Sequence, residues 1–262
     1  MKKVAVNLFV SSNFIKHLKR WYHWYAKTGH CYDIHITVPD KGCAKKVESL
    51  KLPNVFITIN DWTCKKEIWY LRVSTTQKLL ETYDQVIVSD LDAYWLRNIS
   101  QLVKGSEKFD FTSSMVNGGY PYRKTKWRKV MCCGFQIFNS TPKTKGFLKY
   151  ILTKEIVKWS KNRFNRYSDQ GVFNVIASKE STKRKRFKIK DKFCEEEYNS
   201  YKGLRIGCMK IHVVRRLWVQ HLRKVKGRKD MLVLHVYEGP WKRKGVKVSD
   251  IDKCINIIAK HK

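Results

Sequence analysis

Two aspartates one residue apart, Asp90 and Asp92, directly follow an apolar run in the segment VIVSDLDAYW. The run at residues 85–89 is expected to form a strand. On an extended strand the side chains of residues i and i+2 point the same way, so the two carboxylates would crowd each other and need a positive partner. Carboxylate oxygens are the ligands that hard divalent cations prefer. The pair is therefore a candidate metal site, although solvated loop carboxylates or a helix cap would give the same short pattern.

Two further positions carry polar groups at the ends of expected elements. His235 follows a late apolar run in LHVYEGPWK, and an imidazole there could be a third metal ligand; a histidine at a strand end without any ligand role is the alternative. In SDQGVFN, Ser168 is expected to cap a helix that places Asp169 and Gln170 in its first turn. A first-turn carboxylate is stabilised as an anion by the helix dipole, so capping alone would also explain Asp169.

The elements that must position these residues alternate along the chain. Strands are expected at residues 4–10, 32–38, 55–59 and 85–89, and helices at 14–27 and 68–82. This alternation predicts an α/β protein with a largely parallel sheet, in which ligands bind beyond the carboxyl ends of the strands. The second half adds expected strands at 109–115 and 132–140, a late strand that runs into a turn within 231–241, and expected helices at 143–159 and 168–178. With no internal repeat and no long linker, one domain is the simpler organisation.

Charge is the unusual bulk property. The 262 residues contain 55 Lys+Arg against 22 Asp+Glu, a net charge of +33, which favours polyanionic ligands. Nine tryptophans and thirteen tyrosines would suit a nucleic-acid-binding protein, but the basic residues are spread along the chain and no nucleic-acid-binding motif is recognisable. The basic segments 183–190, expected to be an exposed hairpin or loop, and 223–229 are expected to be solvated charge runs that could contact an anionic membrane peripherally.

The first apolar run is short, contains Asn7, and is followed by no small-residue cleavage site, so we interpret it as a strand and not as a signal peptide. No stretch reaches the roughly 18–20 apolar residues of a membrane span. The eight cysteines form no C-x-x-C pair and are expected to be reduced thiols. These features favour a cytoplasmic protein that is soluble or peripherally attached to a membrane.

Four segments, YLRVSTTQKLL to YDQVIVSDLDAYWLRNI, CGFQIFNSTPKTKGFLKYI, SDQGVFN and LHVYEGPWK, occur in the order seen in GT-A-type glycosyltransferases. Over residues 70–242 the sequence resembles the glycogenin and lipopolysaccharide galactosyltransferase group and the nucleotide-diphospho-sugar transferases related to plant arabinosyl- and xylosyltransferases. The resemblance implies a GT-A (Rossmann-like) fold, a mixed, mainly parallel sheet flanked by helices. Within one domain spanning 1–262, residues 1–100 would be the nucleotide-binding half, and residues 101–262 the acceptor-side half with the carboxyl-terminal metal and diphosphate motif.

The resemblance also implies an activity. The enzyme would be a metal-dependent glycosyltransferase, a hexosyl- or pentosyltransferase, that moves a sugar from a nucleotide-diphosphate-sugar, expected to be a UDP-sugar, to a hydroxyl of a glycan, lipid or protein with retention of configuration. An inactive GT-A-like scaffold and the nucleic-acid-binding protein are the alternatives. Mn²⁺ or Mg²⁺ would be held by Asp90, Asp92 and His235, and Asp169 and Gln170 would be the catalytic pair at the sugar.

The donor-binding set implied by the resemblance consists of Ser11, Arg72, Asp90, Leu91, Asp92, Gly239 and Lys242. The chain departs from the family pattern at three places within it or beside it. The gap from His235 to Lys242 is about one residue longer than usual, so Lys244 could replace Lys242. The segment around Ser11 lacks the usual aspartate, which leaves the nucleotide base open. Cys132-Cys133-Gly134 stands where the bacterial group has Asn-Ala-Gly, which leaves the sugar and the acceptor contacts open.

Overall fold

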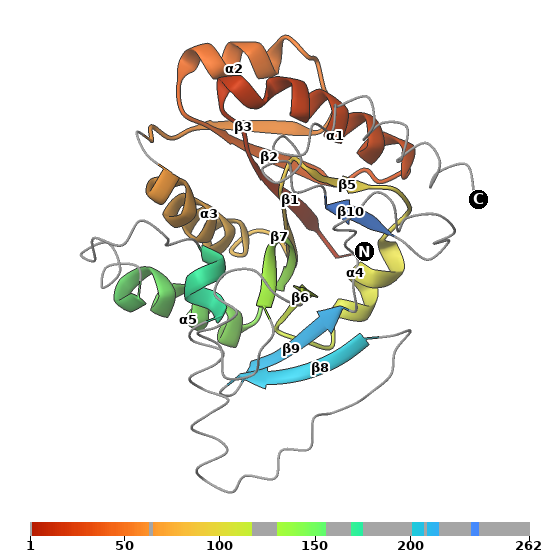
Figure 1. Cartoon of the computed structure of the whole chain (residues 1–262), viewed down its shortest axis with the longest axis vertical. Helices are drawn as coiled ribbons and strands as arrows, with labels where there is room; N and C mark the ends of the chain where they lie inside the picture. Colours follow the sequence, from red (N-terminus) through yellow and green to blue (C-terminus); the bar gives the residue numbers. More distant parts are fainter. Residues whose placement is uncertain are drawn as a thin grey trace, which may run out of the picture.

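The computed structural model describes residues 2–62, 65–116, 130–155, 169–174, 201–206, 209–214 and 232–235. Figure 1 shows the strands at the centre of the molecule with helices on either side. The strands are β1 (Val4–Phe9), β2 (Asp33–Val38), β3 (Val55–Ile59), β4 (Gln85–Ser89), β5 (Ala93–Trp95), β6 (Phe111–Val116), β7 (Val130–Asn139), β8 (Tyr201–Ile206), β9 (Met209–Val214) and β10 (Val233–His235). The helices are η1 (Ser12–Phe14), α1 (Ile15–Lys27), α2 (Lys41–Glu48), α3 (Lys65–Leu79), α4 (Ser100–Ser106), α5 (Pro142–Tyr150) and η3 (Ile151–Glu155). Residues 169–174 form a further short helical segment.

Eight strands form one sheet in the order β3-β2-β1-β4-β7-β6-β9-β8, and β10 pairs with β5 in a second, two-stranded sheet. Strands β3, β2, β1 and β4 are mutually parallel. Strand β7 runs antiparallel to both of its neighbours, β4 and β6, whereas β9 is parallel to β6 and β8 is antiparallel to β9. The predicted mixed, mainly parallel α/β sheet is therefore confirmed. It contains strands from both halves of the sequence.

The first strands are apolar on both faces because helices cover both sides of the sheet. On one side, Val6 and Leu8 of β1 pack in a cluster with Leu18 and Trp21 of α1. On the other side, the strands pack with α3 and α5 in a second cluster that includes Val88, Val73 and Leu148. The sheet is thus the middle layer of three, and the carboxyl ends of β1 and β4 lie side by side at one edge.

The expected elements of the first half match the structure closely. The strands at 55–59 and 85–89 have the predicted bounds. The helix expected at 14–27 begins with the 3-10 turn η1 and continues as α1, and the one expected at 68–82 is α3, shifted by three residues toward the amino terminus.

Helix α2, which follows β2, was not among the helices expected from the sequence. The Asp40 side chain accepts a hydrogen bond from the Cys43 N–H at 2.7 Å and caps the amino terminus of a helix. The expectation for 143–159 was also inexact, because α5 gives way to the π-helical η3 at Ile151. The basic segments 183–190 and 223–229 lie outside the described residues.

Among the helices that the structure describes, none has the length and apolarity needed to cross a bilayer.

Candidate functional site

The two aspartates lie on a tight turn that connects β4 to β5. Strand pairing continues one residue beyond β4, because the Asp90 N–H donates to the Gly134 carbonyl oxygen at 2.7 Å. The Ala93 N–H then donates back to the Asp90 carbonyl oxygen at 3.0 Å and closes a four-residue turn. The expectation that Asp90 and Asp92 share one face of an extended strand is therefore wrong. The turn instead buries Leu91 in the core while the side chains on either side of it stay partly exposed.

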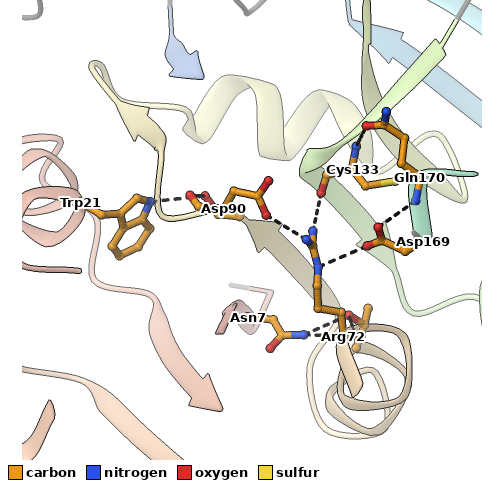
Figure 2. A network of polar contacts seen from close by, with 9 residues as sticks. Asn7, Trp21, Arg72, Asp90, Cys133, Asp169 and Gln170 are labelled. Atoms are coloured by element: carbon orange, nitrogen blue, oxygen red, sulfur yellow. Dashed lines mark hydrogen bonds and ion pairs between the residues drawn. The ribbon is translucent and has the colours of Figure 1, made fainter. Parts of the chain in front are cut away.

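Arg72 supplies a positive charge beside Asp90. Its Nη1 donates to Asp90 Oδ1 at 2.8 Å, its Nη2 donates to the Cys133 carbonyl oxygen at 2.5 Å, and its Nε lies 3.3 Å from Asp169 Oδ2. Figure 2 shows this guanidinium between Asp90 and Asp169. Arg72 is almost completely buried, so it is not the helix-surface arginine that a basic composition would suggest. One side chain of α3 thus joins the turn after β4, the strand β7 and the helical segment at 169.

Burial and neighbouring charges together shift the pKa values in this cluster. Burial lowers the pKa of Arg72, but the carboxylates of Asp169 and Asp90 outweigh it and hold that pKa above its ordinary value. Burial raises the pKa of Asp169, and the guanidinium of Arg72 opposes the rise. The pKa of the Cys133 thiol is raised well above its usual range, again chiefly by burial. Arg72 therefore stays charged, and Asp169 accepts a proton more readily than an exposed aspartate does.

The helical segment 169–174 is bound to the amino-terminal part of β7, on the edge that faces away from β6. The pairing of β7 with β4 ends at Phe135, and the Asp90 N–H extends it to Gly134, so the part of β7 that precedes Gly134 lacks a strand neighbour on that side. The Asn174 amide fills this gap: Oδ1 accepts from the Met131 N–H at 2.7 Å and Nδ2 donates to the Met131 carbonyl at 2.8 Å. Gln170 Oε1 accepts from the Cys133 N–H at 3.4 Å. These bonds place Asp169 and Gln170 beside Arg72.

Strand β10 brings a distant part of the sequence to the same turn. The backbone of His235 is paired with Ala93, the residue after Asp92, in the antiparallel β5–β10 ladder. Ser11 follows β1, which is the parallel neighbour of β4, and so lies at the same edge of the sheet as Asp90. Of the other predicted residues, Ser168, Gly239, Lys242 and Lys244 lie outside the described part of the chain.

Within the described residues, no three side chains of His, Cys, Asp or Glu form a group that could hold a metal ion. The residue types nevertheless suit a metal ion. The carboxylates of Asp90 and Asp92 share one turn. The backbone of His235 is paired with Ala93, the residue after Asp92. Oxygen ligands with one imidazole are compatible with Mn²⁺ and Mg²⁺. The residue types present therefore fit a divalent cation.

Sequence reasoning missed Asn174. Asn174 is the only amide side chain in GVFN and lies four residues after Gln170, which is one helical turn; this spacing was the available indication that it shares a face with Gln170. The vicinal Cys132 and Cys133 are both buried and unbridged in β7, as expected for thiols in a buried strand. Both side chains pack in the interior of the protein. Arg72 and Gln170 contact only the backbone of Cys133, at its carbonyl oxygen and its N–H.

Comparisons with known proteins agree with this arrangement. The profile of the nucleotide-diphospho-sugar transferase family matches residues 60–246. Among solved structures, mouse xyloside xylosyltransferase 1 in its apo form is similar with a TM-score of 0.57 and 11% identity over 89% of this chain and 97% of that one. The galactosyltransferase LgtC, in complex with donor and acceptor sugar analogues, is similar with a TM-score of 0.50 and 13% identity over 65% and 69% of the two chains. No curated protein sequence matches. At these identities the structural likeness shows the fold, and it confirms the GT-A prediction.

Proposed function

The chain belongs to the nucleotide-diphospho-sugar transferase family and is a glycosyltransferase that uses a nucleotide-sugar; from this premise we propose the finer features of its reaction. The donor is a UDP-sugar, a divalent metal ion is required, the acceptor is a hydroxyl of a glycan, lipid or protein, and configuration is retained. The observation that carries the proposal is the turn holding Asp90 and Asp92 at the carboxyl end of β4, next to the backbone of His235. Ligands of open α/β sheets bind at that edge.

Asp90, Asp92 and His235 would hold Mn²⁺ or Mg²⁺. When bound, such an ion neutralises charge on the diphosphate leaving group. Other residues of the chain would orient these ligands: Arg72 holds one oxygen of Asp90, and the β5–β10 pairing holds the backbone of His235 beside the turn. Leu91 buries the middle of the turn, Ser11 would contact the nucleoside, and Gly239 with Lys242, or with Lys244 in its place, would contact the diphosphate.

Asp169 and Gln170 would act on the sugar side. Asp169 is buried and its raised pKa suits a group that accepts a hydrogen bond or a proton from a hydroxyl. With retention of configuration, Asp169 and Gln170 would orient the donor sugar and the acceptor. With inversion, Asp169 would be the general base. The side chain of Gln170 is tied to the β7 backbone through Cys133, which supports a role in fixing this end of the site.

The remaining proposals concern the whole protein. We propose that residues 1–262 act as one domain, supported by the eight-stranded sheet to which both halves contribute strands. A reducing, cytoplasmic location is supported by the free thiols of Cys31, Cys43, Cys132 and Cys133. Peripheral contact with an anionic membrane is supported by the net charge of +33.

The test is a panel of nucleotide-sugars with Mn²⁺, in which release of nucleoside diphosphate and the melting temperature are measured together. A UDP-sugar should raise the melting temperature, since only the native state binds it, and should release UDP when an acceptor is present. Stabilisation without release would favour the inactive scaffold. Salt-sensitive retention on DNA with no response to any nucleotide-sugar would favour the nucleic-acid-binding protein instead.

A further inference from the structure

The hydroxyl group of Ser89, the last residue of β4, has all its hydrogen-bonding capacity in use. It accepts from the indole Nε1–H of Trp21 and from that of Trp95, each at 3.3 Å, and donates to the Asp90 carbonyl oxygen at 3.2 Å. A serine hydroxyl has one proton and two lone pairs, so these three bonds saturate it. Figure 2 shows the indole nitrogen of Trp21 pointing toward a side-chain oxygen beside Asp90.

The two indoles belong to a tightly packed aromatic cluster. Trp21 and Trp95 are fully buried, with ring centroids 5.7 Å apart in an edge-to-face arrangement. Tyr25 stacks on Trp21 at 5.1 Å and meets the Trp95 ring edge at 5.3 Å, and Phe135 meets Trp95 at 5.8 Å. Such contacts restrict ring rotation. The two N–H donors therefore reach Ser89 from fixed positions on α1 and β5.

The main chain of Asp90 is held from several directions, and Ser89 supplies one of them. The Asp90 carbonyl accepts from both the Ser89 hydroxyl and the Ala93 N–H, and the Asp90 N–H donates to Gly134. On the other side of the sheet, Arg72 holds the Asp90 carboxylate. Ser89 thus connects the turn to α1 through its hydrogen bonds to Trp21 and to the Asp90 carbonyl oxygen. Arg72 connects the turn to α3.

We propose that Ser89 is a positioning residue for the donor site: it transmits the fixed geometry of the tryptophan cluster to the turn at 90–93 and so preorganises the carboxylates of Asp90 and Asp92. This inference rests on the proposed function, in which those carboxylates bind the metal and the donor diphosphate. If the turn samples several conformations, the apparent affinity for a ligand falls in proportion to the fraction of molecules whose turn has the binding conformation. A merely structural serine would satisfy the two indoles without affecting ligand affinity.

The test compares four variants with the wild type. Ser89→Ala removes the acceptor and the donor, Ser89→Thr keeps the hydroxyl, and Trp21→Phe removes one indole donor. Trp24→Phe is the matched control, because Trp24 lies on the same helix, is similarly buried, and has no hydrogen bond to Ser89 in the described structure. Two quantities are measured: hydrogen–deuterium exchange of the peptide covering 89–95 without ligand, and the dissociation constant of UDP in MnCl₂ by calorimetry.

Ser89→Ala should accelerate exchange at 90–93 and raise the dissociation constant about tenfold, the change expected from losing roughly one hydrogen bond. Trp21→Phe should give a smaller change in the same direction, whereas Ser89→Thr and Trp24→Phe should behave like the wild type. Unchanged exchange in Ser89→Ala overturns the inference, and so does faster exchange with an unchanged dissociation constant. If the wild type itself does not bind UDP, the proposed donor is wrong, and the exchange data alone then decide whether Ser89 fixes the turn.

Discussion

Arg72 contacts two carboxylates that have different proposed roles, Asp90 at the metal and Asp169 at the sugar. Its Nη1, Nη2 and Nε are each in contact with the protein, at Asp90, Cys133 and Asp169. In the described structure the guanidinium of Arg72 thus joins these two carboxylates, and its proposed effect on a donor would pass through them. The helix dipole alone would favour an ionised Asp169, but burial raises the pKa of this group, which makes it a better proton acceptor.

Substitutions at Asp169 and Gln170 distinguish the two stereochemical outcomes. If configuration is retained, Asp169→Asn and Gln170→Ala should both lower transfer to a similar extent without preventing donor binding, because each misplaces the sugar. If it is inverted, Asp169→Asn should be far more damaging, by roughly 10²–10⁴-fold, since the acceptor loses its base. The anomeric configuration of the product, read by NMR, is measured alongside the rates. Wild-type transfer in both variants, with stability lowered by about 1 kcal/mol, would leave only a capping role.

His30 gives the protein a predicted pH-dependent stability. The buried His30 ring accepts a hydrogen bond at Nε2 from the Ile99 N–H at 2.9 Å, and burial lowers its pKa to about 4. Between about pH 6.5 and pH 4 the unfolded state binds this proton and the folded state does not, so the free energy of unfolding falls as the pH is lowered. The slope is at most about 1.4 kcal/mol per pH unit.

The measurement for His30 is urea unfolding of the wild type and of His30→Gln at several pH values. Glutamine keeps an acceptor for the Ile99 N–H but does not titrate, so the two stability curves should converge as the pH falls from 6.5 to 4. Curves that stay parallel over this window would show that His30 does not carry the effect.

The helical segment 169–174 depends on the amino-terminal part of β7, which extends past the end of β4. Its first-turn residues Asp169 and Gln170 were predicted from the sequence because a serine followed by an acidic residue is a local pattern. The role of Asn174 was not predictable, because it replaces a strand neighbour for Met131, 43 residues away. Local patterns do not specify which backbone groups a sheet leaves unpaired.

Replacing Asn174 should therefore destabilise the fold more than a surface asparagine does. Asn174→Ala leaves the N–H and the carbonyl of Met131 buried without their partner, at a cost of about 1–3 kcal/mol per group. Asn98→Ala is the control: Asn98 also bonds to the backbone, but it is exposed and water replaces its bonds. Chemical unfolding measures both variants, and equal losses of stability would contradict the role given to Asn174.

The turn at 90–93 illustrates a similar limit at the level of elements. The strand before it was predicted with its bounds, because an apolar run of five residues is a strong local pattern. The turn was not predicted, because it depends on the Ala93 N–H returning to Asp90 and on the burial of Leu91. Likewise, α2 was missed because a proline and a glycine close together, Pro39 and Gly42, are typical of a turn. In the structure the side chain of Asp40, which lies between them, caps the amino terminus of a helix.

For the whole molecule, alternating strands and helices predicted the parallel half of the sheet from local patterns alone. The antiparallel placement of β7 and the pairing of β10 with β5 did not follow from residue patterns, since they join segments that are far apart in the sequence. That His235 lies near the turn of Asp90 and Asp92 was predicted only from the family resemblance. The structure supports it at the level of the backbone, through the pairing of His235 with Ala93.

The most direct test of the central claim is calorimetric titration of UDP into the wild type, Asp92→Asn and His235→Ala, in MnCl₂ and in EDTA. The wild type should bind UDP in MnCl₂ and lose roughly a hundredfold in affinity in EDTA, and both variants in MnCl₂ should bind as weakly as the wild type in EDTA while keeping the wild-type melting temperature. Wild-type affinity of Asp92→Asn and His235→Ala, unchanged by EDTA, would contradict a metal-assisted donor site at this turn.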